Sequence, residues 1–160
     1  MAIENGVAGV TIKSKTRVFP AKAVEKKECP IVTFDLPYVT FFYNQKVLLY
    51  KGNSGGGDFE EMVGRLKDGL GVVLEYFYPL AGRLGLDEEG VLRVEKCGEE
   101  EGWVEVAEAV AHGVSVADLA GNEASALIQE IVPFTGILNV EGLHRPLLAV
   151  QEFPNRKQKM

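Results

Sequence analysis

The chain has 160 residues, 46% of them hydrophobic, and a formal net charge of -6 at pH 7. Such a chain is long enough for one globular domain with a hydrophobic core, and its composition argues against disorder. An acidic protein disfavours nucleic-acid binding, which needs clustered basic side chains; the only basic cluster is the terminal group Arg156, Lys157 and Lys159. No apolar run approaches the roughly 20 residues that span a bilayer. We therefore expect a cytoplasmic protein without a membrane span.

The residues that bind metals or anions do not form a convincing site. Three adjacent carboxylates at residues 99–101 cannot converge on one ion without ligands from elsewhere. The glycine-rich stretch 52–57 precedes a helix but lacks Gly-Lys-Ser/Thr, and acidic residues follow it, so it does not fit a phosphate cradle. Cys29 and Cys97 could form one disulfide, but two separated cysteines are more typical of a reducing compartment. We expect unreactive thiols, no metal and no bound cofactor.

The first third of the chain predicts short strands and turns. Residues 16–19 form a strand candidate that Pro20 ends, and residues 34–37 predict a turn or a one-turn helix. Residues 38–51 are the most β-like stretch, because aromatic and β-branched side chains dominate it. Asn44 and Gln45 are expected to divide this strand into two pieces.

A long amphipathic helix is predicted over residues 58–78. Its apolar side chains recur at spacings of three and four, which makes one stripe: Phe59, Met62, Val63, Leu66, Leu70, Val73, Leu74 and Phe77. Asp58 and Glu61 match a capping box, and Pro79 must end the helix. The internal glycines predict close packing: Gly64, Gly69 and Gly71. We expect the three aromatic residues 76–78 to lie in the core.

The second half alternates strands with short helices. Gly82 is expected to let the chain reverse, and a hairpin follows, with strands at 83–86 and 91–95 and Gly90 at positive φ. A third strand covers residues 103–109. Ser115 caps one short helix, residues 123–132 form another, and residues 147–150 read as a buried strand. These elements together predict a mixed α/β fold.

Several motifs occur in an order that resembles the BAHD (HxxxD-type) acyltransferases of plants. The central one is Tyr78-Pro79-Leu80-Ala81-Gly82-Arg83-Leu84, with Asp87-Glu88-Glu89-Gly90 after it. Thr33-Phe34-Asp35-Leu36-Pro37 and Phe41-Phe42-Tyr43 come before it, and Pro133-Phe134 and Arg145-Pro146-Leu147-Leu148-Ala149-Val150-Gln151 follow. The resemblance implies a chloramphenicol-acetyltransferase-like fold, a mixed sheet with one long helix and short helices.

The same resemblance implies acyl transfer from acyl-CoA, as co-substrate, to a small hydroxyl or amine acceptor. The family's catalytic histidine lies in HxxxD, a motif expected a little beyond Gln151. Here Val116 stands four residues after His112, and Leu148 four after His144, so we assign neither histidine a catalytic role. We expect residues 1–151 to be an incomplete N-terminal domain, residues 152–160 to be a divergent polar tail, and this truncated chain to be inactive alone.

Positions that border the acceptor pocket in the family match Tyr38, Thr40 and Phe42, which would share one face of the strand at 38–51. Ordinary core residues would show the same pattern. Two other functions stay open: a non-catalytic interaction module derived from the family, and a small α/β ligand-binding domain. Unpaired sheet edges in a truncated domain also predict self-association.

Overall fold

The structure is a computed structural model that describes residues 9–25, 28–50, 58–97, 102–119 and 124–154. The glycine-rich stretch at 52–57, the carboxylates at 99–101 and the basic terminal cluster lie outside these residues. The described part contains two three-stranded sheets, one long helix and several short helices. The predicted mixed α/β class is therefore confirmed.

The larger sheet has the strand order β1-β5-β6. Strand β1 (Gly9–Val18) runs antiparallel to β5 (Val104–His112), and β6 (Ala149–Glu152) runs parallel to β5. A parallel pair needs a crossover connection, and here α2 (Val116–Leu119), α3 (Ala124–Ile131) and the 3-10 helix η4 (Asn139–Leu143) supply it. The predicted cap of the first of these helices is confirmed, since the Asp118 amide donates to the Ser115 hydroxyl oxygen at 3.3 Å and the Ser115 amide donates to the Asp118 carboxylate at 2.7 Å.

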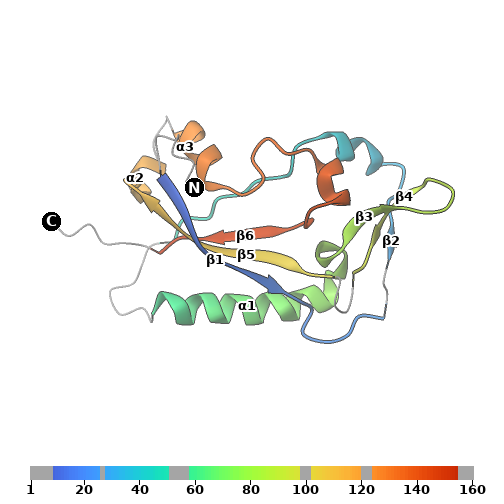
Figure 1. The fold of residues 1–160 in the computed structure, drawn as a ribbon, viewed down its shortest axis with the longest axis horizontal. Helices are drawn as coiled ribbons and strands as arrows, with labels where there is room; N and C mark the ends of the chain where they lie inside the picture. Colours follow the sequence, from blue (N-terminus) through green and yellow to red (C-terminus); the bar gives the residue numbers. More distant parts are fainter. Residues whose placement is uncertain (1–8, 26–27, 51–57, 98–101, 120–123, 155–160) are drawn as a thin grey trace.

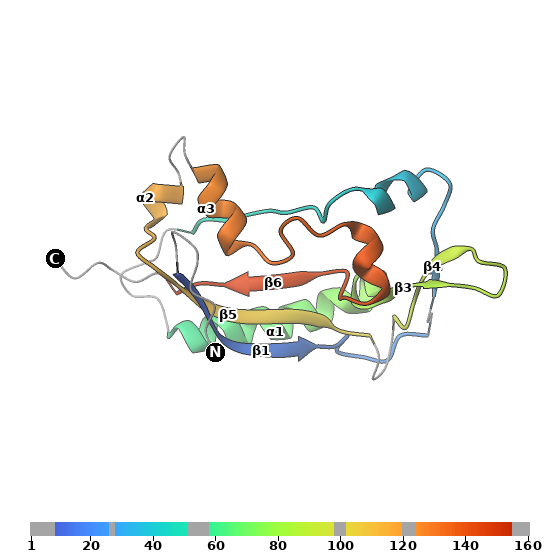
Figure 2. The same cartoon turned by 45° about the horizontal axis from the view of Figure 1, so that its top comes forward.

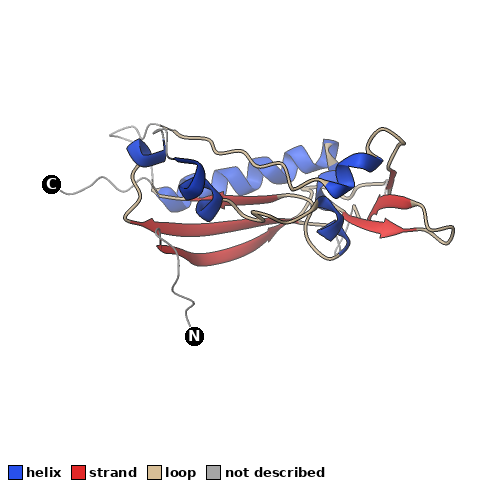
Figure 3. Ribbon diagram, turned by 90° about the horizontal axis from the view of Figure 1, so that it is seen from above, coloured by secondary structure: helices blue, strands red, loops and turns tan. Residues whose placement is uncertain are grey.

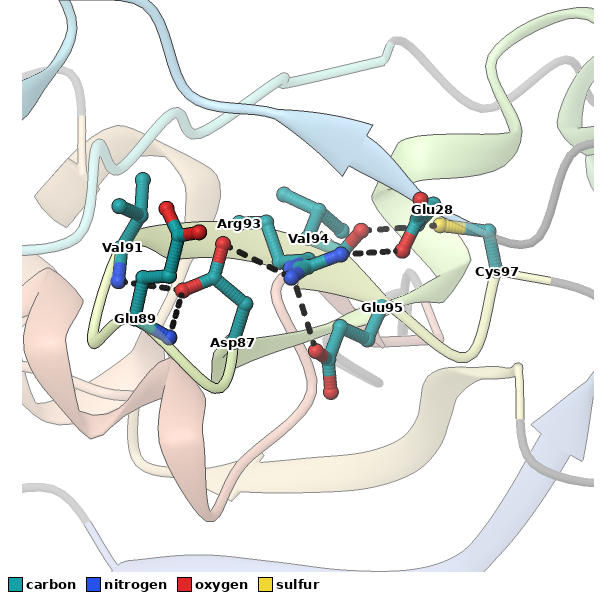
Figure 4. A network of polar contacts seen from close by, with 8 residues as sticks. All are labelled: Glu28, Asp87, Glu89, Val91, Arg93, Val94, Glu95 and Cys97. Atoms are coloured by element: carbon teal, nitrogen blue, oxygen red, sulfur yellow. Dashed lines mark hydrogen bonds and ion pairs between the residues drawn. The ribbon is translucent and has the colours of Figure 1, made fainter.

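The smaller sheet has the order β2-β4-β3, all antiparallel. Its strands are β2 (Cys29–Pro30), β3 (Arg83–Leu86) and β4 (Leu92–Glu95). In the β3–β4 turn the Asp87 carboxylate accepts hydrogen bonds from the amides of Glu89 and Val91, and Gly90 has φ of 78° as predicted. Figure 4 shows the Arg93 guanidinium on β4 between the carboxylates of Asp87, Glu95 and Glu28. The hairpin is thus pinned to the segment that enters β2.

Helix α1 (Phe59–Tyr76) runs along one side of the larger sheet (Figures 1 and 2). Its Leu74 is fully buried in a core with residues of β1, β5 and the turn after the helix: Val18, Val104, Val106 and Ala81. On the same side, the Lys67 ammonium bonds the Glu108 carboxylate of β5 at 2.8 Å. Seen from above, the helix lies behind the strands along their length (Figure 3). These contacts make α1 the main cover of that sheet face.

Three details of the helix prediction are wrong. Asp58 occupies the N-cap position but its side chain makes no capping hydrogen bond. Of the three glycines only Gly71 is closely packed, against the Phe19 carbonyl, whereas Gly64 and Gly69 face open space. Tyr76 and Phe77 are 76% and 61% exposed rather than buried. The contact between α1 and the larger sheet buries only part of the apolar stripe of α1. The remaining apolar side chains of the helix therefore stay at the surface.

The strand predicted at residues 38–51 is also wrong. Tyr38 and Thr40 belong to a 3-10 helix, η1 (Leu36–Thr40), which has Pro37 in its first turn. Beyond it the chain runs in extended form toward the α2 and α3 end (Figures 1 and 2). Within the described residues, its ladder contact is one bridge, Phe42 to Leu138. High β-propensity makes a strand only where a partner supplies a ladder, and no further described strand pairs with it here.

Candidate functional site

The motif at residues 78–84 connects α1 to β3 and packs closely against β4. It forms the 3-10 helix η2 (Tyr78–Ala81) directly after α1 and leads into β3. Gly82 has φ of -74°, so the chain does not need glycine there to reverse, contrary to the prediction. A Cβ at this position would lie 2.5 Å from Val94 Cγ1 and 2.6 Å from the Glu95 carbonyl oxygen. Glycine is required because β4 approaches the backbone this closely.

Arg83 connects the 78–84 motif to the larger sheet. Its Nη1 donates to the carbonyls of Ala81, Gly82 and Trp103, at 2.7 to 3.1 Å. The guanidinium carbons of Arg83 and Arg17 lie 4.2 and 4.5 Å from the centre of the Trp103 ring, a distance at which cation–π attraction acts. Burial lowers the pKa of Arg83 from its ordinary value. The side chain therefore serves the fold rather than a substrate.

An apolar surface lies where η1 and η4 meet. We call it the aromatic surface, and it consists of six exposed side chains: Leu36, Tyr38, Phe41, Phe42, Leu138 and Val140. Backbone bonds hold its two segments together, since the Asn139 amide donates to the Phe41 carbonyl at 2.7 Å and the Tyr43 amide donates to the Ile137 carbonyl. The Asn139 side chain adds a bond to the Tyr38 carbonyl at 2.8 Å. An apolar surface fixed in this way can bind a hydrophobic group.

The three predicted pocket residues lie near each other but not on one strand face. Tyr38 stacks edge-on against Phe41 with ring centres 5.5 Å apart. The Thr40 hydroxyl donates to the Pro37 carbonyl at 2.8 Å inside η1, so it caps its own helix. Phe42 carries the bridge to Leu138. The structure brings Tyr38 and Phe42 to the aromatic surface. They are placed there by the 3-10 turn η1, and not by the alternation of side chains along a strand that the sequence predicted.

Sequence reasoning missed the two side chains that position this surface, Tyr43 and Asn139. The Tyr43 hydroxyl donates to the Pro146 carbonyl at 3.0 Å, and its ring packs edge-on against Phe134. Burial raises the pKa of Tyr43 from its ordinary value, although Arg145 and Arg83 act against this rise. Both contacts join residues about a hundred positions apart, so no local spacing could have signalled them.

His144 lines an open hollow of about 430 Å³. The hollow lies beside β3 and the end of β4, and its polar lining comprises Arg83, Glu95, Lys96 and His144. His144 is exposed at the end of η4, and among the described residues its ring donates no hydrogen bond to a carboxylate. An imidazole without such a partner has no group that fixes its tautomer.

The two histidines are far apart. His112 is exposed and is the last residue of β5. His144 lies near the start of that strand, because its hollow includes Arg83, which bonds the Trp103 carbonyl just before β5. A nine-residue strand spans about 30 Å. The histidines therefore cannot act on one substrate group.

The described residues offer neither a metal centre nor a membrane-spanning helix. They contain no group of three or more His, Cys, Asp and Glu side chains arranged to hold a metal ion. None of the described helices combines the length and the apolar character needed to cross a bilayer.

A mixed sheet covered by one long helix, with a parallel strand returned through short helices, defines a CoA-acyltransferase-like α/β fold. The family model described as Transferase family matches residues 8–152. The chain is 52% identical over 151 residues to BAHD acyltransferase DCR of Arabidopsis thaliana, a match that covers 89% of this chain and 31% of the relative. The chain belongs to the BAHD acyltransferase family.

Two other relatives widen the comparison. Hydroxycinnamoyl-CoA:5-hydroxyanthranilate N-hydroxycinnamoyltransferase HHT1 of Avena sativa is 34% identical over 149 residues, covering 89% of this chain and 32% of the relative. Brassinosteroid-related acyltransferase 1 of Arabidopsis thaliana is 36% identical over 93 residues, 58% of this chain and 17% of the relative. At its widest matches, the chain spans about a third of the length of these plant proteins.

Proposed function

We propose that this chain forms part of an enzyme that transfers an acyl group from acyl-CoA to a small hydroxyl or amine acceptor. The observation that carries the proposal is the family match over residues 8–152, together with 52% identity to a BAHD acyltransferase. Acyl-CoA is a co-substrate in this proposal and not a resident cofactor. A cytoplasmic location is part of this proposal.

The aromatic surface is the part of the chain that we assign to acceptor binding. Tyr38 and Phe42 offer exposed ring faces, and the bonds from Asn139 hold the segments that carry them in place. Small-molecule sites typically combine apolar and aromatic walls with a few polar groups. The Thr40 hydroxyl already donates within its own helix, so in this proposal it borders the pocket without donating to the acceptor.

A chimera tests the proposal directly. In BAHD acyltransferase DCR, the segment that matches this chain is replaced by residues 8–152 of this chain, and transfer between that enzyme's own donor and acceptor is measured. We expect the chimera to retain activity, because both segments form the same part of one family. A folded chimera with no transfer above the empty-vector background would contradict the proposal.

Substitutions in the active chimera test the acceptor surface. Tyr38→Ala and Phe42→Ala should each raise the acceptor KM about 10-fold, since losing a buried aromatic contact costs roughly 1–3 kcal/mol, while the KM for acyl-CoA changes little. Tyr76→Ala is the control, because Tyr76 is also an exposed tyrosine but lies on α1, outside the aromatic surface. Equal acceptor KM values in all three variants would contradict the assignment of Tyr38 and Phe42 to the acceptor pocket.

The 160 residues tested as they stand should not catalyse transfer. A general base contributes typically 10²–10⁴-fold, and neither His112 nor His144 is followed by aspartate at the fourth position. Purified chain is given several acyl-CoA donors with a panel of alcohols and amines, and thiol release is followed. Turnover above background that disappears in a His144→Ala variant would show that the hollow supplies a base. The division into residues 1–151 and a polar tail at 152–160 remains part of this proposal.

A further inference from the structure

The two cysteines, 68 positions apart in the sequence, converge on one residue of β4. Cys29 on β2 is the direct ladder partner of Val94. The Cys97 sulfur lies 3.9 Å from the Val94 carbonyl oxygen, just beyond the end of the same strand. Figure 4 shows this sulfur turned back toward Val94 and away from the course of the chain. Both cysteines are unpaired thiols in the structure.

The side chains of the two cysteines lie on the same face of the small sheet. Residues directly opposite in an antiparallel ladder project to one face, with Cβ atoms about 4.5–5.5 Å apart, so Cys29 shares the face of the Val94 side chain. The Cys97 sulfur is on that face too. A Cβ placed on Gly82 would meet Val94 Cγ1 at 2.5 Å and Cys97 Sγ at 3.0 Å. The Val94 side chain and the Cys97 sulfur therefore occupy one small volume next to Cys29.

The two thiols differ in accessibility. Cys97 is fully buried, whereas Cys29 is partly exposed. Burial raises the pKa of Cys97 to about 11, and negative charge on Cys29 and on Glu28 raises it further. Cys97 is thus a protonated thiol at neutral pH, shielded from solvent, and Cys29 is the sulfur that an oxidant meets.

We propose that Cys29 and Cys97 are an oxidisable pair that a peroxide converts to an intramolecular disulfide. The Cys29 thiol gives up its proton, and the thiolate attacks one oxygen of hydrogen peroxide. The O–O bond breaks, Cys29 becomes a sulfenic acid, and the hydroxide that leaves takes up the proton lost by the Cys29 thiol, as water. The Cys97 sulfur then attacks the Cys29 sulfur, the S–OH bond breaks, and the Cys97 proton leaves with the hydroxide as a second water. Two thiols are oxidised and one peroxide is reduced.

The bond would tie β2 to the end of β4; in the part of the chain that the structure describes, two ladder pairs join these strands. It would also close a long loop that contains η1 and α1. Such a cross-link removes conformational freedom mainly from the unfolded chain. This inference concerns a modification and is independent of the proposed acyl transfer.

Mass spectrometry of the folded chain treated with hydrogen peroxide tests the proposal. We expect the intact mass to fall by two hydrogen atoms, the two cysteine peptides to elute as one cross-linked species, and dithiothreitol to reverse both. The melting temperature should rise by roughly 5–15 °C on oxidation. An unchanged or lower melting temperature would show that the fold does not hold the sulfurs in bonding geometry.

Two variants test the order of events. Cys97→Ser should stop at oxygen adducts of Cys29 or disulfides between chains, whereas Cys29→Ser should leave Cys97 unmodified, because Cys97 is buried. The wild-type result decides the proposal even if a variant misfolds. Oxygen added to Cys29 in the wild-type chain, with Cys97 still open to alkylation after unfolding, would overturn it.

Discussion

Replacing Gly82 by alanine is the sharpest test of how the 78–84 motif works. The backbone conformation at Gly82, φ -74° and ψ -168°, is open to any residue, so the change introduces no torsional strain. The whole effect must come from the added methyl group. That group would lie 2.5 Å from Val94 Cγ1, 2.6 Å from the Glu95 carbonyl oxygen and 3.0 Å from Cys97 Sγ.

The size of the effect follows from which neighbours can move. The Val94 side chain can shift slightly, but the Glu95 carbonyl belongs to the β3–β4 ladder, where Glu95 pairs with Arg83. Overpacking typically costs about 1–3 kcal/mol, and we expect a cost at the upper end of this range because the Glu95 backbone cannot move aside. Alanine offsets about 0.4–1 kcal/mol of this cost, because it reduces the conformational entropy of the unfolded chain. We expect Gly82→Ala to lower the free energy of unfolding by about 2 kcal/mol, which moves the urea midpoint down by about 1 M.

Gly69→Ala is the matched control. Gly69 lies in the interior of α1, and a Cβ there meets nothing within 4 Å. Alanine should stabilise the helix by about 0.5–1 kcal/mol. Urea unfolding followed by the fluorescence of Trp103, the single tryptophan, measures both variants. Equal stabilities for Gly82→Ala and Gly69→Ala would refute the view that close packing, rather than a turn, demands glycine in the motif.

Three further predictions concern other contacts. Arg83→Lys should lower the free energy of unfolding by about 2 kcal/mol, since lysine cannot make three carbonyl bonds while stacking on Trp103. The control is Arg65→Lys at an exposed position, which should change the free energy of unfolding by less than about 0.5 kcal/mol. Equal losses in the two variants would contradict the role of Arg83. Burial raises the pKa of Glu152 above its ordinary 4.5, so the folded state binds the proton more tightly and wild-type stability falls as pH rises through that range. Glu152→Gln should therefore be the more stable form in urea at pH 7, and its advantage should vanish below pH 4.5; an advantage independent of pH would exclude the titration of Glu152. Size-exclusion chromatography and ANS binding should reveal self-association, because β1 and β6 have one neighbour each among the described strands and the aromatic surface is exposed; a sharp monomer peak without dye binding would count against it.

Features that depend on a few neighbouring residues could be predicted. Helix α1 follows from its apolar spacing and ends at Tyr76, shortly before Pro79, which cannot continue the hydrogen-bond ladder. The hairpin follows from Gly90, and the start of α2 from the pairing of Ser115 with Asp118. The order of the motifs along the chain indicated the family, and the match over residues 8–152 confirmed it.

The candidate site was only partly predictable. Tyr38 and Phe42 do lie together, but a strand face was expected and a 3-10 turn is present. The side chains that hold them, Tyr43 and Asn139, act on partners about a hundred residues away. No spacing rule covers such a contact, because its geometry exists only after both segments have packed.

The sequence by itself therefore determined the elements whose energetics are local: the periodicity of α1, the Ser115 cap, the end of α1 before Pro79 and the turn at Gly90. Tertiary structure alone decided which part of the α1 stripe is buried, that residues 38–50 form one bridge rather than a ladder with the described strands, and that Gly82 is needed for close packing. It also decided that Cys29 and Cys97 meet at Val94. Burial and strand pairing depend on which distant residues arrive at a surface, and local propensity contains no information about those partners.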